Sequence, residues 1–132
     1  MRKNVDVDKP WHKSIPFAQG VVVEGRLLIT SGVTARGPDG NLIGAGDIRT
    51  QMEQCFANLG DVLEAAGCGF GDVVKYVMYT TDIEAFSANA DVYRSHFVGR
   101  PASTLVEVSR LVDPDMSVEI ECVVKLPEAT NE

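Results

Sequence analysis

The sequence predicts an α+β domain in which two helices cover one face of a single mixed sheet. Segments rich in β-branched residues, typical of strands, lie near both ends of the chain and once in the middle. Between them, two longer segments carry apolar residues spaced by threes and fours, which is typical of amphipathic helices. The predicted order is ββαβαββ, and two helices can cover only one face of such a sheet. We expect one domain over residues 1–132.

The first two strands are predicted at 18–24 and 26–31. Both are rich in β-branched residues, and Gly25 between them marks a turn, so the pattern predicts a hairpin. The following segment, 34–40, contains Pro-Asp-Gly. Because proline and glycine supply turn dihedrals, this segment is predicted to be an exposed loop.

The first helix is predicted from Asp47 to Gly67, where the glycine ends the apolar period. Its apolar face comprises Ile48, Met52, Cys55, Phe56, Leu59, Val62, Leu63 and Ala66. A strand follows at 72–81. Thr81-Asp-Ile-Glu84 is a capping-box pattern that opens a second helix, and Gly99 with Pro101 ends it.

Two strands, at 104–108 and 117–125, are predicted to close the fold. In the last one, alternate residues share a face. Val118, Ile120, Cys122 and Val124 are assigned to the helix-covered face, and Glu119, Glu121, Val123 and Lys125 to the other. The second face mixes apolar and charged residues, which favours a subunit interface with wet clefts at the charged positions.

The composition bears on location and partners. The net charge of −7 would repel a polyanion, so nucleic acid is an unfavoured partner. No apolar run reaches about 18 residues, and Met1 to Pro10 is polar, so we expect a soluble cytoplasmic protein without membrane contact. Three cysteines without a CxxC pair fit reduced thiols in that compartment.

Several other chemistries lack their motifs. With only two histidines, His12 and His96, and no ligand spacing, we expect no metal and no cofactor. Gly67-Cys-Gly-Phe-Gly71 follows a helix and precedes a strand, the reverse of a phosphate-binding loop. No GxSxG motif supports serine hydrolase chemistry.

Eight separated segments follow one another in a recognisable order and spacing. They are Pro16-Phe-Ala-Gln-Gly-Val21, Ile29-Thr-Ser-Gly32, Asp61-Val-Leu-Glu-Ala-Ala-Gly67, Asp72-Val-Val-Lys75, Tyr79-Thr-Thr-Asp82, Tyr93-Arg-Ser-His-Phe97, Arg100-Pro-Ala-Ser-Thr-Leu-Val-Glu-Val108 and Val118-Glu-Ile-Glu121. Through these segments the chain resembles the Rid (YjgF-type, or RidA) family over roughly residues 14 to 126. The resemblance implies a chorismate-mutase-like fold whose sheets pack into a trimeric barrel. It also implies three sites, in clefts between subunits, for small carboxylate-bearing molecules.

In the family's deaminases, an arginine in a Pro-Ala-Arg-Ser segment clamps the substrate carboxylate. Water then hydrolyses an enamine or imine to a keto acid and ammonia. By this resemblance Ser31, Gly32 and Glu119 match the family's site residues. Two positions depart from it: Phe17 replaces a tyrosine, and Ser103 stands where the arginine is expected.

A different cation could replace the missing arginine. Arg36 is the preferred candidate because its loop follows Ser31 and Gly32 directly, while Arg100 precedes Ser103 by three residues. His12, ahead of the first strand, could fold over a cleft and titrate near neutral pH. The alternatives are a solvated loop charge for Arg36, a helix-end charge for Arg100 and a terminus anchor for His12.

Glu119 and Glu121 share one strand face at about 7 Å, where poorly solvated like charges raise each other's pKa. A carboxyl with a raised pKa could act as general acid or base during imine hydrolysis. Alternatively, both pair with basic residues such as Lys75 or Lys125. We assign a catalytic role to Glu119 and a structural one to Glu121.

The sequence therefore favours a homotrimeric hydrolase of the enamine/imine deaminase type with a divergent substrate. The substrate-binding residues would be Phe17, Ser31, Gly32, Arg36, Ser103 and Thr104, with Glu119 catalytic. One alternative is a noncatalytic ligand-binding or regulatory trimer, and a further one is an endoribonuclease-like activity.

Overall fold

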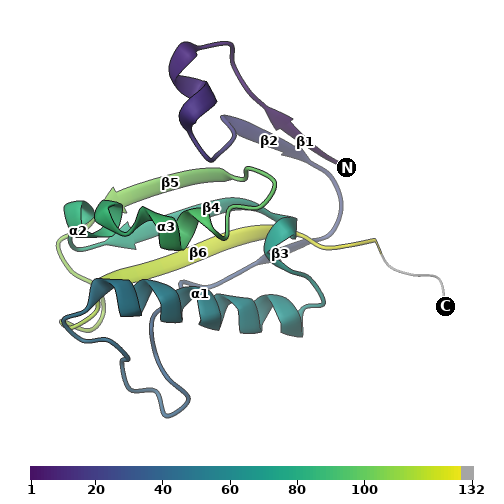
Figure 1. Cartoon of the computed structure of the whole chain (residues 1–132). Helices are drawn as coiled ribbons and strands as arrows, with labels where there is room; N and C mark the ends of the chain where they lie inside the picture. The colour runs from purple at the N-terminus through teal and green to yellow at the C-terminus, as the bar shows by residue number, and fades with distance from the viewer. Residues whose placement is uncertain (129–132) are drawn as a thin grey trace.

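The computed structural model describes residues 1–128 and contains a four-stranded sheet in the order β3-β6-β4-β5 (Figure 1). The strands are β3 (Leu27–Ile29), β6 (Val118–Lys125), β4 (Val73–Thr80) and β5 (Ala102–Glu107). β5 runs parallel to β4, whereas β6 is antiparallel to both of its neighbours. The predicted mixed sheet is confirmed.

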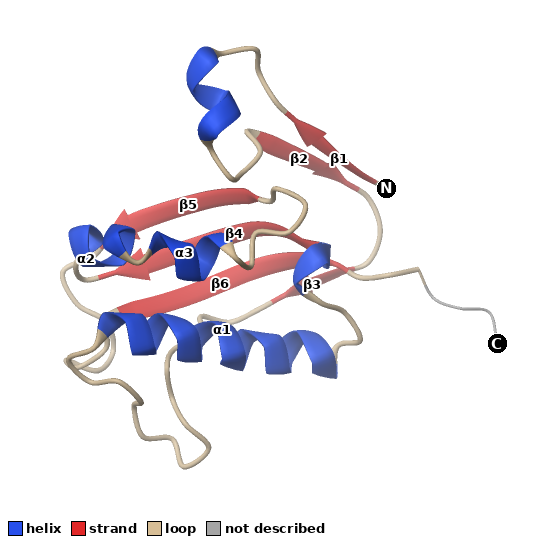
Figure 2. Cartoon of the chain, in the orientation of Figure 1, coloured by secondary structure: helices blue, strands red, loops and turns tan. Residues whose placement is uncertain are grey.

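The helices α1 (Ile48–Ala65), α2 (Ile83–Ala88) and α3 (Ala90–Arg94) form the second layer (Figure 2). Their buried side chains and those of the sheet form one hydrophobic cluster, so all three lie on the same face. Its largest fully buried members are Tyr76, Phe56, Phe86, Met52, Leu59 and Leu63. The α+β class is therefore confirmed. None of the helices in residues 1–128 is long and apolar enough to cross a membrane.

The first helix begins and ends as its sequence predicts. The Asp47 carboxylate accepts hydrogen bonds from the Thr50 backbone N–H at 3.2 Å and the Thr50 hydroxyl at 2.8 Å, which caps α1. Gly67, with φ +76°, takes the left-handed conformation that stops it. Val62 and Ala66, which are predicted on the apolar face, are exposed, and Ala66 lies just past the last residue of α1.

The second predicted helix is divided in two at Asn89. Its side-chain amide donates to the Ala85 carbonyl at 2.9 Å, and such a side chain competes with helical backbone bonding. The capping residue is Asp82, which accepts from the Ala85 backbone N–H at 3.1 Å. The prediction that Thr81 opens the capping box was therefore wrong by one residue.

The predicted hairpin at 18–31 is also wrong. β2 (Gly20–Val23) pairs with β1 (Arg2–Val5) in a separate two-stranded ribbon, while β3 joins β6. Gly25, with φ +123°, turns the chain between the two sheets instead of closing a hairpin. We call β1, the short helix η1 (Pro10–Ser14) and β2 together the N-terminal arm.

The N-terminal arm docks on the turn that leads into β5 (Figure 1). Arg2 donates to the Gly71 carbonyl at 2.9 Å and to the Gly99 carbonyl at 3.1 Å. Asn4 also donates to the Gly99 carbonyl, at 2.8 Å, and the Ala18 N–H donates to the Pro101 carbonyl at 3.1 Å. Backbone carbonyls of Gly99 and Pro101 in this turn, and that of Gly71 before β4, therefore anchor the arm.

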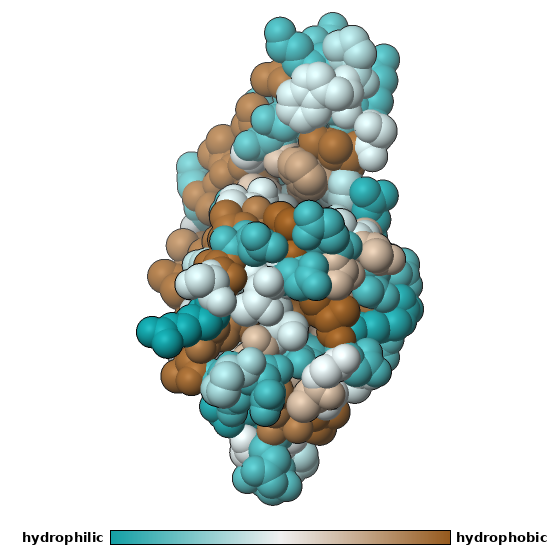
Figure 3. Space-filling view, turned by 90° about the vertical axis from the view of Figure 1, so that its left-hand side faces the viewer, coloured by the Kyte–Doolittle hydropathy of each residue, from teal (hydrophilic) through white to brown (hydrophobic). Residues whose placement is uncertain are grey.

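Within residues 1–128, no helix covers the other face of the sheet. In β6 the burial alternates as predicted, with Val118, Ile120, Cys122 and Val124 buried and Glu119, Glu121, Val123 and Lys125 half-buried. Ile29, opposite Val123, is 73% exposed. Figure 3, which looks onto the left-hand end of Figure 1, shows hydrophobic residues gathered along one edge. This apolar surface is available for association.

Candidate functional site

The end of β3 and the start of β6 hold Gly32 against Glu119. Val33 exchanges two backbone hydrogen bonds with Ile120, at 2.8 and 2.9 Å, which fixes the preceding residue beside the strand. A Cβ atom on Gly32 would lie 2.5 Å from Glu119 Oε2 and 2.7 Å from its Cδ. The Glu119 carboxylate therefore occupies space that only glycine leaves open. Ser31, next to it, is exposed.

Tyr79 connects the two glutamates of β6. It is the cross-strand partner of Glu119 and donates a hydrogen bond to Glu121 Oε1 at 2.5 Å. That hydrogen bond, then burial and the negative charges of Glu121 and Glu119, raises the pKa of the Tyr79 phenol. Within residues 1–128, no hydrogen bond or ion pair engages the Glu119 carboxylate. Glu121 is thus structurally held, whereas Glu119 is free to meet a ligand.

The alternative pairing of the glutamates with lysines does not occur within the described chain. Lys75 donates to the Thr104 hydroxyl at 2.7 Å, and Lys125 pairs with Glu128 at 3.7 Å. Thr104 therefore shares the uncovered face with a cation. The sequence had given no reason to connect Lys75 with Thr104, because the strand pairing that joins them was unknown.

The remaining predicted site residues lie near the start of β5. Phe17 is half-buried against the core, and its carbonyl accepts from Arg100 at 3.0 Å. Ser103 pairs with Tyr76, whose side chain is in the core, so alternation turns Ser103 toward the helix-covered face. Thr104 points to the uncovered face.

One chain does not bring the two groups of residues together. Glu119, on β6, pairs with Tyr79 near the end of β4. Ser103, on β5 at the other side of β4, pairs with Tyr76 nearer the start of that strand. Ser103 and Glu119 also face opposite sides of the sheet. We call Ser31, Gly32 and Glu119 the carboxylate half-site and Phe17, Arg100, Ser103 and Thr104 the β5 half-site.

Arg36, the preferred replacement cation, is engaged in its own loop. Its guanidinium donates to the Gly40 carbonyl at 2.8 Å, and its carbonyl accepts from the Asn58 amide at 2.8 Å. A backbone bridge to Leu42 closes the loop. The structure thus uses Arg36 to hold the loop that follows the carboxylate half-site.

Arg100 is not a solvated helix-end charge. Its guanidinium forms two hydrogen bonds with the Asp6 carboxylate, at 2.8 and 3.1 Å, and the His12 imidazole lies 3.3 Å from the same carboxylate. The hydrogen bond from Arg100 is the main cause that lowers the pKa of Asp6. Sequence reasoning missed Asp6, because nothing local links residues 94 positions apart.

The cysteines are poor nucleophiles in this fold. Burial raises the pKa of Cys55 to about 12 and that of Cys122 to about 11, so neither forms a thiolate near neutral pH. Burial also raises the pKa of Cys68, whose thiol donates to the Leu63 carbonyl at 3.3 Å. Across residues 1–128, no three His, Cys, Asp or Glu side chains gather to hold a metal ion.

A family model described as Endoribonuclease L-PSP matches residues 10–126. The RutC family protein slr0709 of Synechocystis sp. is 38% identical over 115 residues, covering 85% of this chain and 87% of that protein. The chain therefore belongs to the YjgF/Rid family, which this model describes. The Rid family protein YyfB of Yersinia pestis has a solved structure with a TM-score of 0.84 and 27% identity, covering 95% of this chain and 98% of that one.

Among the relatives of this Rid-family chain are proteins with a named activity. The 2-iminobutanoate/2-iminopropanoate deaminase of Capra hircus is 35% identical over 109 residues, which cover 82% of this chain and 78% of that protein. The Rid-family assignment made from the sequence is therefore confirmed. The residues matched by the family model include both half-sites.

Proposed function

We propose that this chain is a hydrolase of the enamine/imine deaminase type, acting on small carboxylate-bearing metabolites in a cleft between two subunits of a homotrimer. The observation that carries the proposal is the free Glu119 carboxylate, held over Gly32 and separated from the β5 half-site. A site divided in this way becomes complete when a second copy supplies the missing half. The imine deaminase named among its relatives supports the reaction type.

The chemistry follows from the position of Glu119. A carboxylate at this point accepts a proton from water while the water oxygen attacks the imine carbon. The proton is then delivered to the nitrogen, and cleavage of the C–N bond leaves a keto acid and ammonia. Ser31 and Gly32 would contact the ligand beside Glu119, and Phe17 would supply an apolar wall from the other subunit.

The serine at position 103 changes what the site can hold. An arginine there would make charge-assisted hydrogen bonds worth on the order of 1.5–3 kcal/mol each, whereas a serine offers one neutral donor. Thr104 offers a second hydroxyl next to Lys75. The preferred substrate therefore need not be the amino-acid-derived enamine typical of the family's deaminases, and turnover of that enamine measures the reaction type alone.

Assembly and location belong to the same proposal. The uncovered sheet face exposes apolar side chains beside Glu119, Glu121 and Tyr79 and would pack against neighbouring sheets in the trimer. Three reduced thiols and the absence of a disulfide among residues 1–128 fit the cytoplasm.

Two other functions have some support. The native serine at position 103 and the hydrogen bond that holds Arg36 to the Gly40 carbonyl favour a noncatalytic trimer that binds a metabolite without turnover. The description of the family model names an endoribonuclease, but a net charge of −7 disfavours binding to a polyanion.

The test is ammonia release from 2-aminoacrylate generated in place. The wild-type protein should accelerate release, and Glu119→Gln should reduce that rate by about 100-fold or more, because general acid–base catalysis contributes at least this much. Glu84→Gln removes the same charge from the exposed side of α2 and should leave the rate unchanged. A fully active Glu119→Gln variant would contradict the proposed catalytic role of Glu119. Thermal stabilisation by a ligand without product formation would favour the noncatalytic trimer. Salt-sensitive cleavage of RNA would favour the endoribonuclease-like activity.

A further inference from the structure

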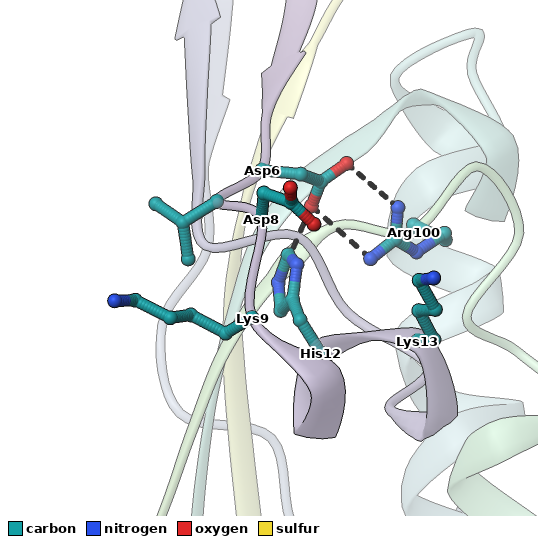
Figure 4. A pocket seen from close by; sticks show the side chains of 7 residues that line it. Asp6, Asp8, Lys9, His12, Lys13 and Arg100 are labelled. Carbon is teal, nitrogen blue, oxygen red and sulfur yellow. Dashed lines mark hydrogen bonds and ion pairs between the residues drawn. The ribbon is translucent and has the colours of Figure 1, made fainter.

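A cavity of about 430 Å³ lies between the N-terminal arm and the start of β5 (Figure 4). Its lining is made of Asp6, Val7, Asp8, Lys9, His12, Lys13 and Arg100. Most of these side chains are charged. The segment 6–9, which links β1 to η1, supplies four lining residues, three of them charged. Arg100 enters from the opposite side, at the turn before β5. The cavity therefore has a cationic wall on the body of the molecule and a mixed wall on the arm.

The Asp6 carboxylate is held in this cavity as a ligand carboxylate would be. Its Oδ2 accepts from Arg100 Nη1 at 2.8 Å, and its Oδ1 accepts from Arg100 Nη2 at 3.1 Å. This two-point fork is the arrangement by which arginine recognises carboxylates. Figure 4 shows Asp6 between Arg100 and His12, with Lys9 pointing away from the pair.

His12 adds a second, independent indication. Its side chain is only 4% exposed, yet among the residues that the structure describes no group forms a well-aligned hydrogen bond with Nε2. The 3.3 Å approach to Asp6 Oδ1 is close enough for attraction but lacks hydrogen-bond geometry. A buried polar nitrogen without a partner is costly, so its presence at a cavity points to an acceptor that is not Asp6.

Asp6 can leave the cavity without detaching the arm. It follows the last ladder residue of β1, Val5, so no strand hydrogen bond fixes it. Arg2 and Asn4 hold β1 through other contacts, to backbone carbonyls. The side chains of Asp6 and Arg100 are 37% and 40% exposed, so solvent and solutes reach their ion pair.

We propose that Arg100 and His12 form a binding site for the carboxylate of a small ligand, and that Asp6 occupies this site when the ligand is absent. The ligand class rests on the proposed function, since a keto acid is the product of imine hydrolysis. Arg100 also holds the Phe17 carbonyl, which connects the site to the β5 half-site. Lys13 at the rim adds attraction for an anion.

The test is calorimetric titration with pyruvate, which is a stable keto acid. Asp6→Asn removes the competing carboxylate, so it should bind pyruvate about tenfold or more tightly than wild type. The double variant Asp6→Asn with Arg100→Gln should lose that gain. Glu24→Gln is the matched control, since it removes one negative charge directly after the arm and outside the cavity and should leave the affinity unchanged. Equal affinities for Asp6→Asn and Glu24→Gln would overturn the proposal.

A measurement on the wild-type protein covers the case in which Asp6→Asn fails to fold. Saturating pyruvate should increase hydrogen–deuterium exchange in the segment 6–9, because displaced Asp6 no longer holds it. Unchanged exchange would overturn the proposal. The ammonia assay keeps the two proposals apart: pyruvate binding at Arg100 without turnover leaves the site standing and removes the hydrolase, whereas turnover unaffected by Arg100→Gln does the reverse.

Discussion

The contact between Gly32 and Glu119 shows how a single missing side chain determines where a carboxylate stands. Because Val33 pairs with Ile120, the backbone of Gly32 cannot withdraw from β6. The carboxylate lies directly over it, in space that any other residue would fill with a Cβ atom. The position of the proposed catalytic group thus depends on a glycine that has no chemistry of its own.

Replacing Gly32 with alanine should therefore reduce activity while the protein remains folded. The new Cβ would lie 2.5 Å from Glu119 Oε2, so the flexible end of that side chain must move. Adjusting one side chain costs about 1.5 kcal/mol or less, but displacing a reacting group by about 1 Å can cost on the order of 100-fold in rate. Ammonia release and thermal unfolding measure the two effects separately.

Gly69→Ala is the control for that substitution. Gly69 has an extended backbone, and nothing lies within 4 Å of an added Cβ. This variant should keep both its activity and its melting temperature. A Gly32→Ala protein with unchanged kcat and KM would show that the position of the Glu119 carboxylate does not matter.

At the level of elements, the sequence predicted the features that depend on neighbouring residues, namely helix ends and strand alternation. The start and end of α1 follow from Asp47 and Gly67, and the strand at β6 follows from its alternating pattern. The hairpin prediction failed because the partners of β2 and β3 are both distant in sequence, and pairing energy there outweighs the local turn at Gly25. The polar sequence of β1 gives no strand signal, since the ribbon is only partly buried.

The cap of α1 offers a test that depends on pH. Hydrogen bonds from Thr50 lower the pKa of Asp47 in the folded protein below its usual 3.8. A lowered folded pKa stabilises the protein above the unfolded pKa, and that contribution is lost as pH falls through the folded value. Asp47→Ala should therefore melt at a lower temperature than wild type at about pH 7, and the difference should shrink toward about pH 3.

Asp47→Asn separates the charge of the cap from its hydrogen bonds. Asparagine caps helices well but does not titrate in this range. The difference between its melting temperature and that of Asp47→Ala should stay constant over the same pH interval, as measured by circular dichroism. A wild-type advantage over Asp47→Ala that persists undiminished in acid would contradict the charged cap.

On the scale of the whole molecule, the sequence identified residues but not their arrangement. Glu119 and Gly32 were both predicted, and the structure brings them into contact. Ser103 was predicted for the same site, yet it lies on another strand and faces the other side. Asp6 has no sequence signal at all, because its partner Arg100 is brought to it only by docking of the N-terminal arm.

The proposed trimer can be tested on its apolar face. Ile29, which is 73% exposed beside Val123, would be buried between subunits, so Ile29→Glu should prevent assembly through the cost of burying a charge. Light scattering after size exclusion should give about three times the 14.3 kDa chain mass for wild type and about one times for the variant. Because the site needs two subunits, the monomeric variant should also lose activity.

Val112→Glu is the matched control for assembly. Val112 is 83% exposed, but it lies in the loop between β5 and β6 and not on the uncovered face. The variant should have the mass and activity of wild type. A monomeric wild-type protein with full activity would remove the need for a second copy at the site.

The separation of Glu119, on β6, from Arg100, in the turn before β5, also has a genetic consequence. Suppose that each junction between subunits takes Glu119 from one chain and Arg100 from the next. The two substitutions then damage opposite sides of a junction. Co-refolding Glu119→Gln with Arg100→Gln would then produce mixed trimers in which one junction has both groups intact and another has neither. Two inactive gene products would restore activity when expressed together, so recessive alleles at these two positions would complement each other in one cell.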